Sequence, residues 1–540
     1  MHPSVSRRTF LSQTLKATLA AAALPVAVAA ESSRTGRQAD GTPPAEGSEK
    51  TPPSAPAARG ATMAEFEFHN DNTLGTSMDL TVVCRGKTQS KAAQKAVMDE
   101  IERLRKILST RDPESEISRL AAATGPVKCS PELLEVLEAC QSWQTRSAGA
   151  FNAQLGDLLD LWTEAAKANE VPEPAALAAL ARRLATPMWK IDKAAGTVER
   201  IGDFKPNGDA LAKGYIVEKA AAAAMAKDPT LAGLLLDIGG DIRVIGSAVE
   251  AAGAPWLIGV AGPKESQDNA LPIAQLKLRD ATVATSGNYA RYFVIGGKLY
   301  SHILDPRTGR PVEDVAGATA VAPDAATADA LATILCVLPP AEGLRLAATV
   351  KGAECFIVCA DGKTHASPGW KTLAVTEGPL PTPAFVAANG AEGWPAGHTV
   401  NVTLELALKG KRPYVAVWVE DAAGAPVRTL TVWGTKSKYQ KDLQTWWSLY
   451  KARHDVIKAV SRATRRAGLY ELAWDGRDDN GRPVKPGPYT IRVEAVQEDG
   501  PRKKLSGVIA CDKGPATVDI PGTTLVKGVS IVFGPATAKQ

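Results

Sequence analysis

The first half of the chain mixes apolar positions at helical spacing with short apolar runs that are typical of strands. Ala93, Val97, Ile101 and Leu104 recur every three or four positions with charges between them, which predicts an amphipathic helix. Further helices are expected at residues 130–140, 209–225 and 324–338. Strands are expected at residues 234–238, 256–260, 281–284 and 355–359. Because no regular βαβ repeat occurs, this pattern predicts an α+β fold rather than a doubly wound sheet.

Two patterns indicate turns between strands. Gly296-Gly297 lies between the apolar runs Tyr292–Ile295 and Leu299–Leu304, which predicts a hairpin. After residue 395, apolar and polar residues alternate, and short strands separated by turns predict a C-terminal, Ig-like β-sandwich over residues 396–540. We interpret Trp474–Gly481 within it as a structural turn, because its acidic residues do not have EF-hand spacing.

The ends of the first folded unit are set by composition. Arg7-Arg8 precedes a short apolar segment, so residues 1–30 are interpreted as a twin-arginine (Tat) export signal, which predicts a periplasmic protein. Residues 31–62 lack Leu, Ile, Val and aromatic residues, so a disordered linker is expected there. The first folded unit is placed at 63–378, and a Pro- and Ala-rich linker at 379–395.

Charge and cysteine content exclude several classes of protein. The chain has 540 residues and a formal charge of only +5, so its total charge does not indicate a nucleic-acid partner. Seven scattered cysteines do not form a disulfide scaffold. Residues 431–470 hold nine Lys or Arg against two Asp, with Trp446, Trp447 and Tyr450 among them. This segment predicts either docking to an acidic protein or membrane surface, or a solvated face beside buried aromatic residues.

Four short polar clusters carry the candidate chemistry. Leu236–Asp241 contains a Gly-Gly turn after a strand, and Asn207–Tyr215 places Lys213 near a helix N-terminus, where anions bind. Ser301–Gly309 combines His302, Asp305 and Arg307 in one turn. Asp329 and Thr333 lie four apart, on one face of a helix, and offer hard oxygen ligands that suit Mg²⁺. Taken singly, each cluster also fits a turn, a capped helix or a polar surface stripe.

Together, and in this order, the clusters resemble the ApbE family of FAD:protein FMN transferases. The resemblance covers about residues 66–375. Its further motifs are Leu74-Gly75-Thr76, Leu108-Ser109-Thr110, Ser115-Glu116-Ile117, Gly149-Ala150-Phe151-Asn152 and Ala284-Thr285-Ser286-Gly287-Asn288-Tyr289.

The resemblance implies that the chain binds FAD, transfers its FMN half to a Thr or Ser of a redox protein and releases AMP. The implied metal ligands for Mg²⁺ are Ala210 (backbone carbonyl), Asp329 and Thr333. The implied cofactor-binding residues are Leu74, Arg111, Ala150, Phe151, Asn152, Asn207, Lys213, Gly239, Gly240 and Ile303. The chain departs from the family at Arg111, where an aromatic residue is usual, and at Asn152 and Asn207, where Asp is frequent.

His302 and Asp305 are the catalytic candidates. The acceptor hydroxyl must lose a proton as it attacks phosphorus, and a neutral His poised near physiological pH can take that proton. The hypothesis is that His302 or Asp305 is this base; alternatively, His302 only hydrogen-bonds the flavin. Two other functions remain open: a Mg²⁺-dependent FAD pyrophosphatase that yields FMN and AMP, and a flavin-binding protein without turnover. The expected partner is a periplasmic or membrane redox protein, with no nucleic acid.

Overall fold

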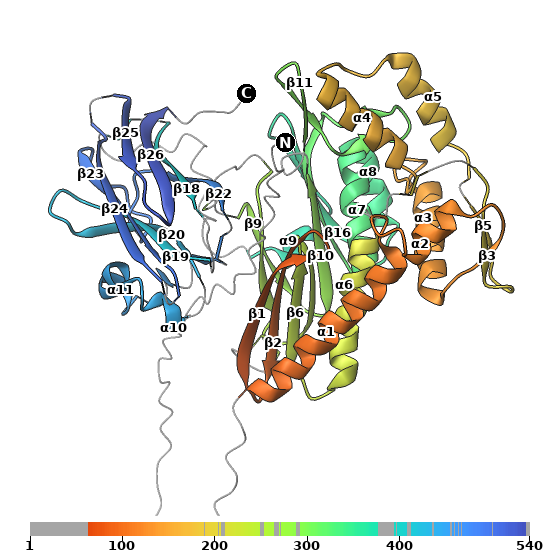
Figure 1. Ribbon diagram of the computed structural model, residues 1–540, viewed down its shortest axis with the longest axis horizontal. Coiled ribbons are helices and arrows are strands. Elements are labelled where there is room, and N and C mark those ends of the chain that lie inside the picture. The colour runs from red at the N-terminus through yellow and green to blue at the C-terminus, as the bar shows by residue number, and fades with distance from the viewer. Residues whose placement is uncertain are drawn as a thin grey trace, which may run out of the picture.

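The computed structural model describes residues 63–535 except 188, 203–204, 207–210, 249–252, 264–268, 270–271, 288–291, 376–393, 396, 408–411, 435–436, 454–455, 458–459, 463, 466, 499 and 513. The predicted export signal and first linker, and most of the second linker, lie outside the described residues. The N-terminal unit mixes helices with antiparallel sheets and the C-terminal unit is built mostly of strands, so the α+β prediction is confirmed (Figure 1).

A long antiparallel sheet forms the centre of the N-terminal unit. Its strands run in the order β1 (Ala64–Thr73), β2 (Thr76–Cys84), β6 (Gly233–Ile238), β7 (Asp241–Gly246), β10 (Ala281–Gly287), β15 (Val315–Ala322), β16 (Glu354–Cys359) and β17 (Thr364–Ala366). Alternate residues of each strand face opposite sides. Met78, Leu80 and Val82 therefore enter the core beneath the helices, while Val83 enters a smaller core on the other face.

Helices cover one face of this sheet. They are α1 (Lys87–Leu108), α6 (Ala212–Lys227), α7 (Ala325–Val337) and α8 (Pro340–Ala348). Asp324 caps α7 by accepting a hydrogen bond from Thr327 N at 2.8 Å, and Glu218 of α6 accepts one from Ala325 N at 3.1 Å, which fixes the start of α7 against α6. The opposite face is covered by β8 (Trp256–Val260), β9 (Ala274–Leu278) and α9 (Trp370–Leu373).

Smaller elements extend the unit at one end of the sheet. One group comprises α2 (Glu116–Ala122), α3 (Pro131–Arg146), β3 (Val127–Lys128), β4 (Trp189–Asp192) and β5 (Thr197–Arg200). Another group packs around Trp162 and comprises α4 (Gly156–Ala168), α5 (Pro174–Leu184), β11 (Tyr292–Ile295), β12 (Lys298–Ser301), β13 (Leu304–Asp305) and β14 (Arg310–Pro311).

The hairpin predicted around Gly296-Gly297 is confirmed, but its second strand ends at Ser301. Leu304, which the sequence placed at the end of that strand, begins β13 and pairs with Pro311 of β14. The chain therefore leaves the hairpin at His302 and turns into a second, very short hairpin.

The C-terminal unit is a sandwich of two sheets, as predicted. One sheet has the order β22 (Gly468–Trp474), β18 (His398–Leu406), β26 (Val526–Pro535), β25 (Ala516–Pro521). The other has the order β21 (Ser461–Arg462), β20 (Pro426–Trp433), β19 (Tyr414–Glu420), β23 (Pro488–Val496), β24 (Arg502–Ala510). Trp394, which the sequence assigned to the linker, packs edge-on against Trp474 and Phe533 in the core between the sheets.

The aromatic residues of the basic segment are largely structural. α10 (Ser437–Gln440) and α11 (Gln444–Tyr450) lie outside the second sheet, and Trp446 and Tyr450 are fully buried against it. The turn at Trp474–Gly481 is also structural, because Asp478 Oδ1 accepts hydrogen bonds from Asn480 N and Arg482 N at 2.8 Å each. Docking through this segment stays a prediction.

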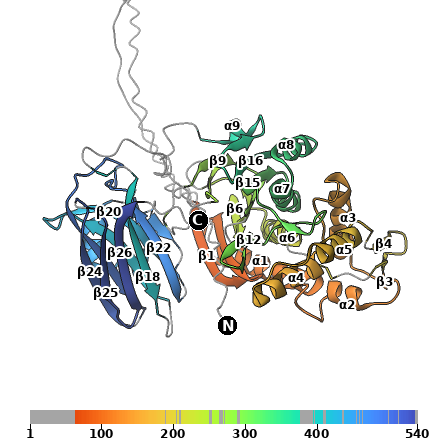
Figure 2. The same ribbon diagram turned by 90° about the horizontal axis from the view of Figure 1, so that it is seen from above.

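The two units lie side by side, with the sandwich beside the β1 edge of the long sheet and away from α4 and α5 (Figure 2). Asn269 contacts β22 by donating to Ala473 O at 2.7 Å and accepting from Ala473 N at 2.9 Å. Each of the seven cysteines lies among the described residues and is a free thiol. No helix among the described residues is long and apolar enough to cross a membrane.

Candidate functional site

A lysine and two carboxylates from three elements meet on the helix-covered face of the sheet. Lys213 lies in the first turn of α6, Asp241 begins β7 and Asp329 lies in α7. The Lys213 Nζ forms an ion pair with Asp241 and lies 4.0 Å from Asp329 Oδ1. The side chains of Asp241 and Asp329 are only 2% and 5% exposed. When both carboxylates are ionised, this buried cluster therefore carries more negative than positive charge.

The electrostatics of Asp329 reflect that imbalance. Burial, and after it the neighbouring Asp241 carboxylate, raise the pKa of Asp329 to about 7, while Lys213 acts in the opposite direction. A group that is costly to ionise in the protein alone becomes easier to ionise when a cation is bound beside it.

Hydroxyl groups complete the cluster. Thr333 lies one turn after Asp329 on the same face of α7, and its Oγ1 is 3.3 Å from Ser286 Oγ at the end of β10. Among the described residues, no group of three or more His, Cys, Asp or Glu side chains is placed to hold a metal ion. The fit to Mg²⁺ therefore rests on two carboxylates together with neighbouring hydroxyls, a hard-oxygen donor set that this ion prefers. The third implied ligand, Ala210, lies outside the described residues, as does Asn207.

Two hairpin turns lie against each other close to this cluster. Leu74 (φ 52°) and Gly75 (φ 80°) join β1 to β2, and Gly239 (φ 61°) and Gly240 (φ 93°) join β6 to β7. Left-handed conformations at both positions are what a two-residue hairpin turn requires. A Cβ on Gly239 would lie 2.6 Å from Thr76 Cγ2, so only glycine allows the two turns to pack this closely.

Polar atoms at these turns have no partner within the described part of the chain. The side-chain hydroxyls of Thr73 and Thr76, which flank Leu74-Gly75, are buried without a hydrogen-bond partner there. Leaving a buried hydroxyl unpaired costs about 1–3 kcal/mol. Two such groups on either side of one turn are consistent with a ligand that carries polar atoms, as FAD does.

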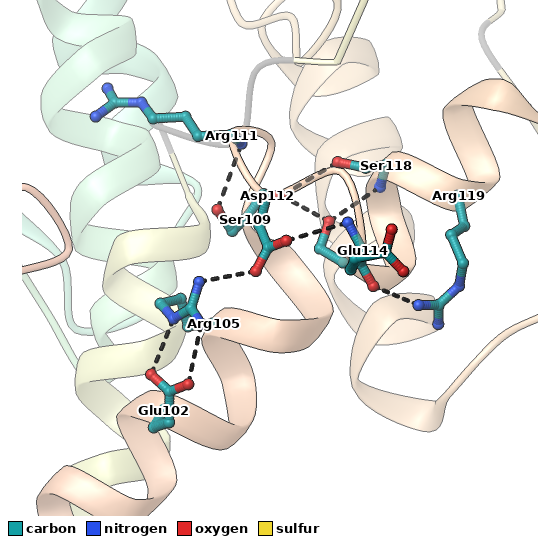
Figure 3. Close-up of polar contacts among 9 residues, drawn as sticks. Glu102, Arg105, Ser109, Arg111, Asp112, Glu114, Ser118 and Arg119 are labelled. Atoms are coloured by element: carbon teal, nitrogen blue, oxygen red, sulfur yellow. Dashed lines mark hydrogen bonds and ion pairs between the residues drawn. The ribbon is translucent and has the colours of Figure 1, made fainter.

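Arg111 reaches the same turn from the loop between α1 and α2. A Cβ on Gly75 would lie 3.3 Å from Arg111 Nη1. Figure 3 shows the arginine side chain pointing away from the network that fixes its loop. In that network, Arg105 bridges Glu102 and Asp112, and Ser115 Oγ donates to Ser109 O at 2.6 Å. The structure thus brings together Leu74 and Arg111, which are far apart in the sequence.

The remaining predicted cofactor residues are buried. Ala150 and Phe151 are each 2% exposed and Ile303 is 7% exposed, and all belong to the core beneath the helices. Asn152 donates to Leu184 O at 2.8 Å and accepts from Gln154 N at 2.8 Å, so its amide holds the local chain path. Any contact of Ala150 or Phe151 with FAD would have to be limited, and these assignments stay predictions.

A cavity of about 870 Å³ opens beside this segment. It lies between α3, α5 and the β13–β14 turn, and Gly149, Asn152, Arg182 and Arg307 are among its lining residues. Within the described residues, no carboxylate lines this cavity. Its volume is within the range of about 300–1,000 Å³ that small-molecule sites have.

The two catalytic candidates have different surroundings. His302 is half-buried and follows Ser301, whose Oγ accepts a hydrogen bond from Ile303 N at 3.0 Å. Asp305 accepts hydrogen bonds from the Arg307 guanidinium at 2.9 and 2.8 Å and from Arg307 N at 2.9 Å. The Asp305 carboxylate therefore holds the turn, which makes His302 the stronger candidate for a base.

Sequence reasoning missed part of the cluster. Asp241 and Ser286 lie within the family motifs, but the motifs assign them no role, and Thr73 lies outside the motifs. The Gly-Gly turn before Asp241 was the available signal, because a two-residue turn places the next residue back on the sheet beside the preceding strand. Contact between Asp241 and Asp329 depends on the packing of α7 and could not be read from spacing.

Both folded units are similar to known proteins. The family model described as "ApbE family" matches residues 74–357, and the model "Predicted periplasmic protein (DUF2271)" matches residues 398–527. The "FAD:protein FMN transferase" of Treponema pallidum is 30% identical over 311 residues, covering 53% of this chain and 84% of the relative. The "FAD:protein FMN transferase" of Vibrio cholerae is 29% identical over 306 residues, covering 55% of this chain and 90% of the relative. The crystal structure of the ApbE protein from Thermotoga maritima superposes with a TM-score of 0.53 at 28% identity, covering 58% of this chain and all of that one.

Proposed function

Because the chain belongs to the ApbE family, we propose that it is an FAD:protein FMN transferase, which moves the FMN half of FAD onto a Ser or Thr of a redox protein. The observation that carries the proposal is the buried cluster of Lys213, Asp241 and Asp329 beside the paired hairpin turns. Hard-oxygen ligands for a cation at Asp329 and Thr333 favour catalysis at the pyrophosphate over flavin binding alone.

The reaction is a substitution at phosphorus. The acceptor hydroxyl oxygen forms a bond to the FMN phosphorus, the bond from that phosphorus to the bridging oxygen breaks, and AMP leaves with the bridging oxygen. We assign His302 as the base that takes the hydroxyl proton. Lys213, at the start of α6, supplies positive charge near the pyrophosphate, where negative charge develops. Arg111 and the hydroxyls of Thr73 and Thr76 bind and orient FAD at the turn between β1 and β2.

We further propose that Asp329 and Thr333, together with Ala210, hold Mg²⁺. Bound there, the ion would neutralise charge on the pyrophosphate oxygens. Replacing Asp329 with Asn keeps the shape and removes one anionic ligand. We expect Asp329→Asn to weaken Mg²⁺ binding at least tenfold, as measured by calorimetric titration of the metal-free protein, which does not depend on turnover. Equal affinity in both proteins would remove Asp329 from the ligand set.

The deciding experiment incubates the protein with FAD, Mg²⁺ and a flavin-free redox domain whose mature form carries FMN on a threonine. Mass spectrometry should show the domain heavier by one FMN, with one AMP released per adduct. Free FMN and AMP without an adduct would indicate a pyrophosphatase instead. Loss of the adduct in His302→Ala, with FAD binding retained, would support the base assignment, and unchanged transfer would refute it.

The location proposed for this reaction is the periplasm, reached by Tat export. The match of residues 398–527 to a predicted periplasmic family supports this proposal. Fractionation of cells that express the full chain tests it, and Arg7→Lys together with Arg8→Lys should abolish export through the Tat system.

A further inference from the structure

Two ion pairs join β7 to α6. Asp241 at the start of β7 pairs with Lys213 in the first turn of α6, and Arg243 of β7 pairs with Glu218 of α6, with Arg243 Nε 3.1 Å from Glu218 Oε2. Residues two apart in a strand lie on the same face, so Asp241 and Arg243 both face the helix. Asp241 therefore either only attaches the helix to the sheet, as Arg243 does, or also serves the candidate site through Lys213.

The sheet holds the backbone of Asp241 on both sides. Asp241 pairs with Ile238 across the β6–β7 turn and with Ala284 of β10. Its side chain is only 2% exposed. Moving this carboxylate would require breaking the pairing of β7 with one of its neighbours. Asp241 is thus a fixed acceptor for the group that it binds.

Lys213 is the partner with conformational freedom. The lysine ammonium stands on a flexible four-carbon stem, and holding it in one place costs entropy. Among the described residues, Asp241 alone accepts a hydrogen bond from Lys213 Nζ, since Asp329 Oδ1 at 4.0 Å is beyond hydrogen-bond distance. An ammonium has three N–H donors, so one goes to Asp241 and two remain for a ligand.

We propose that Asp241 is a positioning residue, which holds the Lys213 ammonium where its two remaining N–H groups bind the pyrophosphate of FAD. The inference rests on the proposed function, because that function places the FAD pyrophosphate at Lys213. The two carboxylates of the cluster then have separate roles: Asp241 orients the lysine, and Asp329 is left to the cation. Orienting a binding group in advance lowers the entropy that FAD binding must overcome.

Positioning and simple charge predict opposite changes in the affinity for FAD. The pyrophosphate is anionic, so by Coulomb interaction alone the removal of the Asp241 charge would tighten FAD binding. If Asp241 acts by holding Lys213, the same removal lets the ammonium adopt other positions and weakens FAD binding. The sign of the change therefore separates the two explanations.

The test measures the dissociation constant for FAD by flavin fluorescence. It uses the full chain without an acceptor protein, at a Mg²⁺ concentration that saturates each variant. We expect Lys213→Met to raise the dissociation constant about tenfold and Asp241→Asn to raise it at least fivefold. In the double variant, the dissociation constant should equal that of Lys213→Met within twofold, because Asp241 has nothing to orient once the lysine is gone.

The matched control is Arg243→Met, which breaks the other ion pair between the same strand and the same helix. It should leave the dissociation constant for FAD within twofold of that of the unaltered protein. Thermal unfolding checks that each variant is folded. If Asp241→Asn unfolds, Asp241→Glu takes its place, since it keeps the charge and displaces it by one methylene group. Charge alone then predicts no change, whereas positioning predicts a rise of at least threefold.

Tighter or unchanged FAD binding in Asp241→Asn overturns the proposal. A further rise when Asp241→Asn is added to Lys213→Met, or an equal rise in Arg243→Met, also overturns it, because Asp241 would then only support the fold. These outcomes leave the transferase function standing. Normal FAD binding by the unaltered protein without any FMN adduct on an acceptor overturns the transferase function, and the role of Asp241 in FAD binding is still decided by the titrations.

Discussion

The backbone N–H of Gly214 donates a hydrogen bond to Oδ2 of Asp329 at 3.0 Å, which joins the first turn of α6 to the middle of α7. The two helices approach closely here, because a Cβ on Gly214 would lie 2.3 Å from Ala325 O and 2.9 Å from Asp329 Cβ. The absence of a side chain at residue 214 therefore sets the position of Asp329 relative to Lys213, one residue earlier in the chain.

Replacing Gly214 with Ala should separate α6 from α7 at this point. Overpacking of this kind costs about 1–3 kcal/mol, and the shift would move Asp329 away from Lys213. We expect Gly214→Ala to lower the free energy of unfolding by that amount and to reduce FMN transfer at least tenfold. Gly125→Ala is the matched control, since a Cβ at residue 125 would meet no atom within 4 Å. Wild-type stability and activity in Gly214→Ala would contradict this account.

Asp237 gives a prediction about pH. Its carboxylate accepts a hydrogen bond from Gly240 N at 2.8 Å within the β6–β7 turn. Burial raises the pKa of Asp237 well above its usual range, and the charge of Asp79, which faces it from β2, adds to the rise. The charge of Asp241 also raises this pKa, while the hydrogen bond from Gly240 N and the charge of Lys213 lower it. A raised pKa in the folded state means that this group costs stability increasingly as the pH rises above about 4.

An asparagine in place of Asp237 keeps the oxygen that accepts the hydrogen bond from Gly240 N, but its side chain does not titrate. We therefore expect Asp237→Asn to gain stability relative to the unaltered protein as the pH is raised from 5 to 8 in urea unfolding measurements. Asp237→Ala also removes the titrating group but leaves Gly240 N unpaired, so it should be about 1–3 kcal/mol less stable than Asp237→Asn at both pH values. A difference between Asp237→Asn and the unaltered protein that does not vary with pH would show that Asp237 is not held in its neutral form.

Arg111 is expected to bind FAD through its guanidinium. Removing that group in Arg111→Ala should raise the dissociation constant for FAD about tenfold, a cost of about 1.4 kcal/mol. Fluorescence titration with FAD measures this directly. Arg119→Ala is the control, because Arg119 lies on α2 nearby and bonds only the backbone oxygen of Glu114 among the contacts drawn in Figure 3. Equal losses in both variants would point to general charge rather than to a specific contact.

The sandwich has its own buried charge, at Glu494. This carboxylate is fully buried, pairs with Arg502 at 2.5 Å and accepts a hydrogen bond from Trp446 N at 2.9 Å. Breaking such a pair costs about 3–5 kcal/mol. Glu494→Gln should therefore destabilise the C-terminal unit by about that amount, with FMN transfer retained at temperatures where the unit stays folded.

The exposed pair of Glu405 and Lys527 serves as the comparison, since Glu405→Gln should cost less than about 1 kcal/mol. Differential scanning calorimetry measures both variants. Loss of transfer in a folded Glu494→Gln protein would show that the sandwich contributes to the reaction.

Periodicity and turn residues predicted several elements correctly and missed others, such as β1, β2, α4 and α5. The helix through Ala93 and Val97, the alternation of Val400, Val402 and Leu404 and the hairpin at Gly296-Gly297 all have the predicted form, because each depends on neighbouring residues. The end of the hairpin was misplaced. Leu304 is apolar, but it pairs with Pro311 across a turn, and hydropathy alone does not choose the partner of a strand.

The candidate site was only partly predictable, because local sequence does not determine which distant segments come into contact. Asp329 and Thr333 lie four residues apart in one helix, so their common face follows from the sequence alone. The residues that complete their surroundings come from β7, β10 and α6, and their positions depend on how two helices pack on the sheet.

The sequence by itself determined the mixed α and β character of the first unit, the strand-rich character of the second and the family to which the chain belongs, because these follow from local periodicity and from motifs in a fixed order. The tertiary structure decided that Asp241 shares Lys213 with Asp329 and that Asp305 holds a turn. Burial and contact between distant segments arise only when the chain packs, and they set the charge balance of the site.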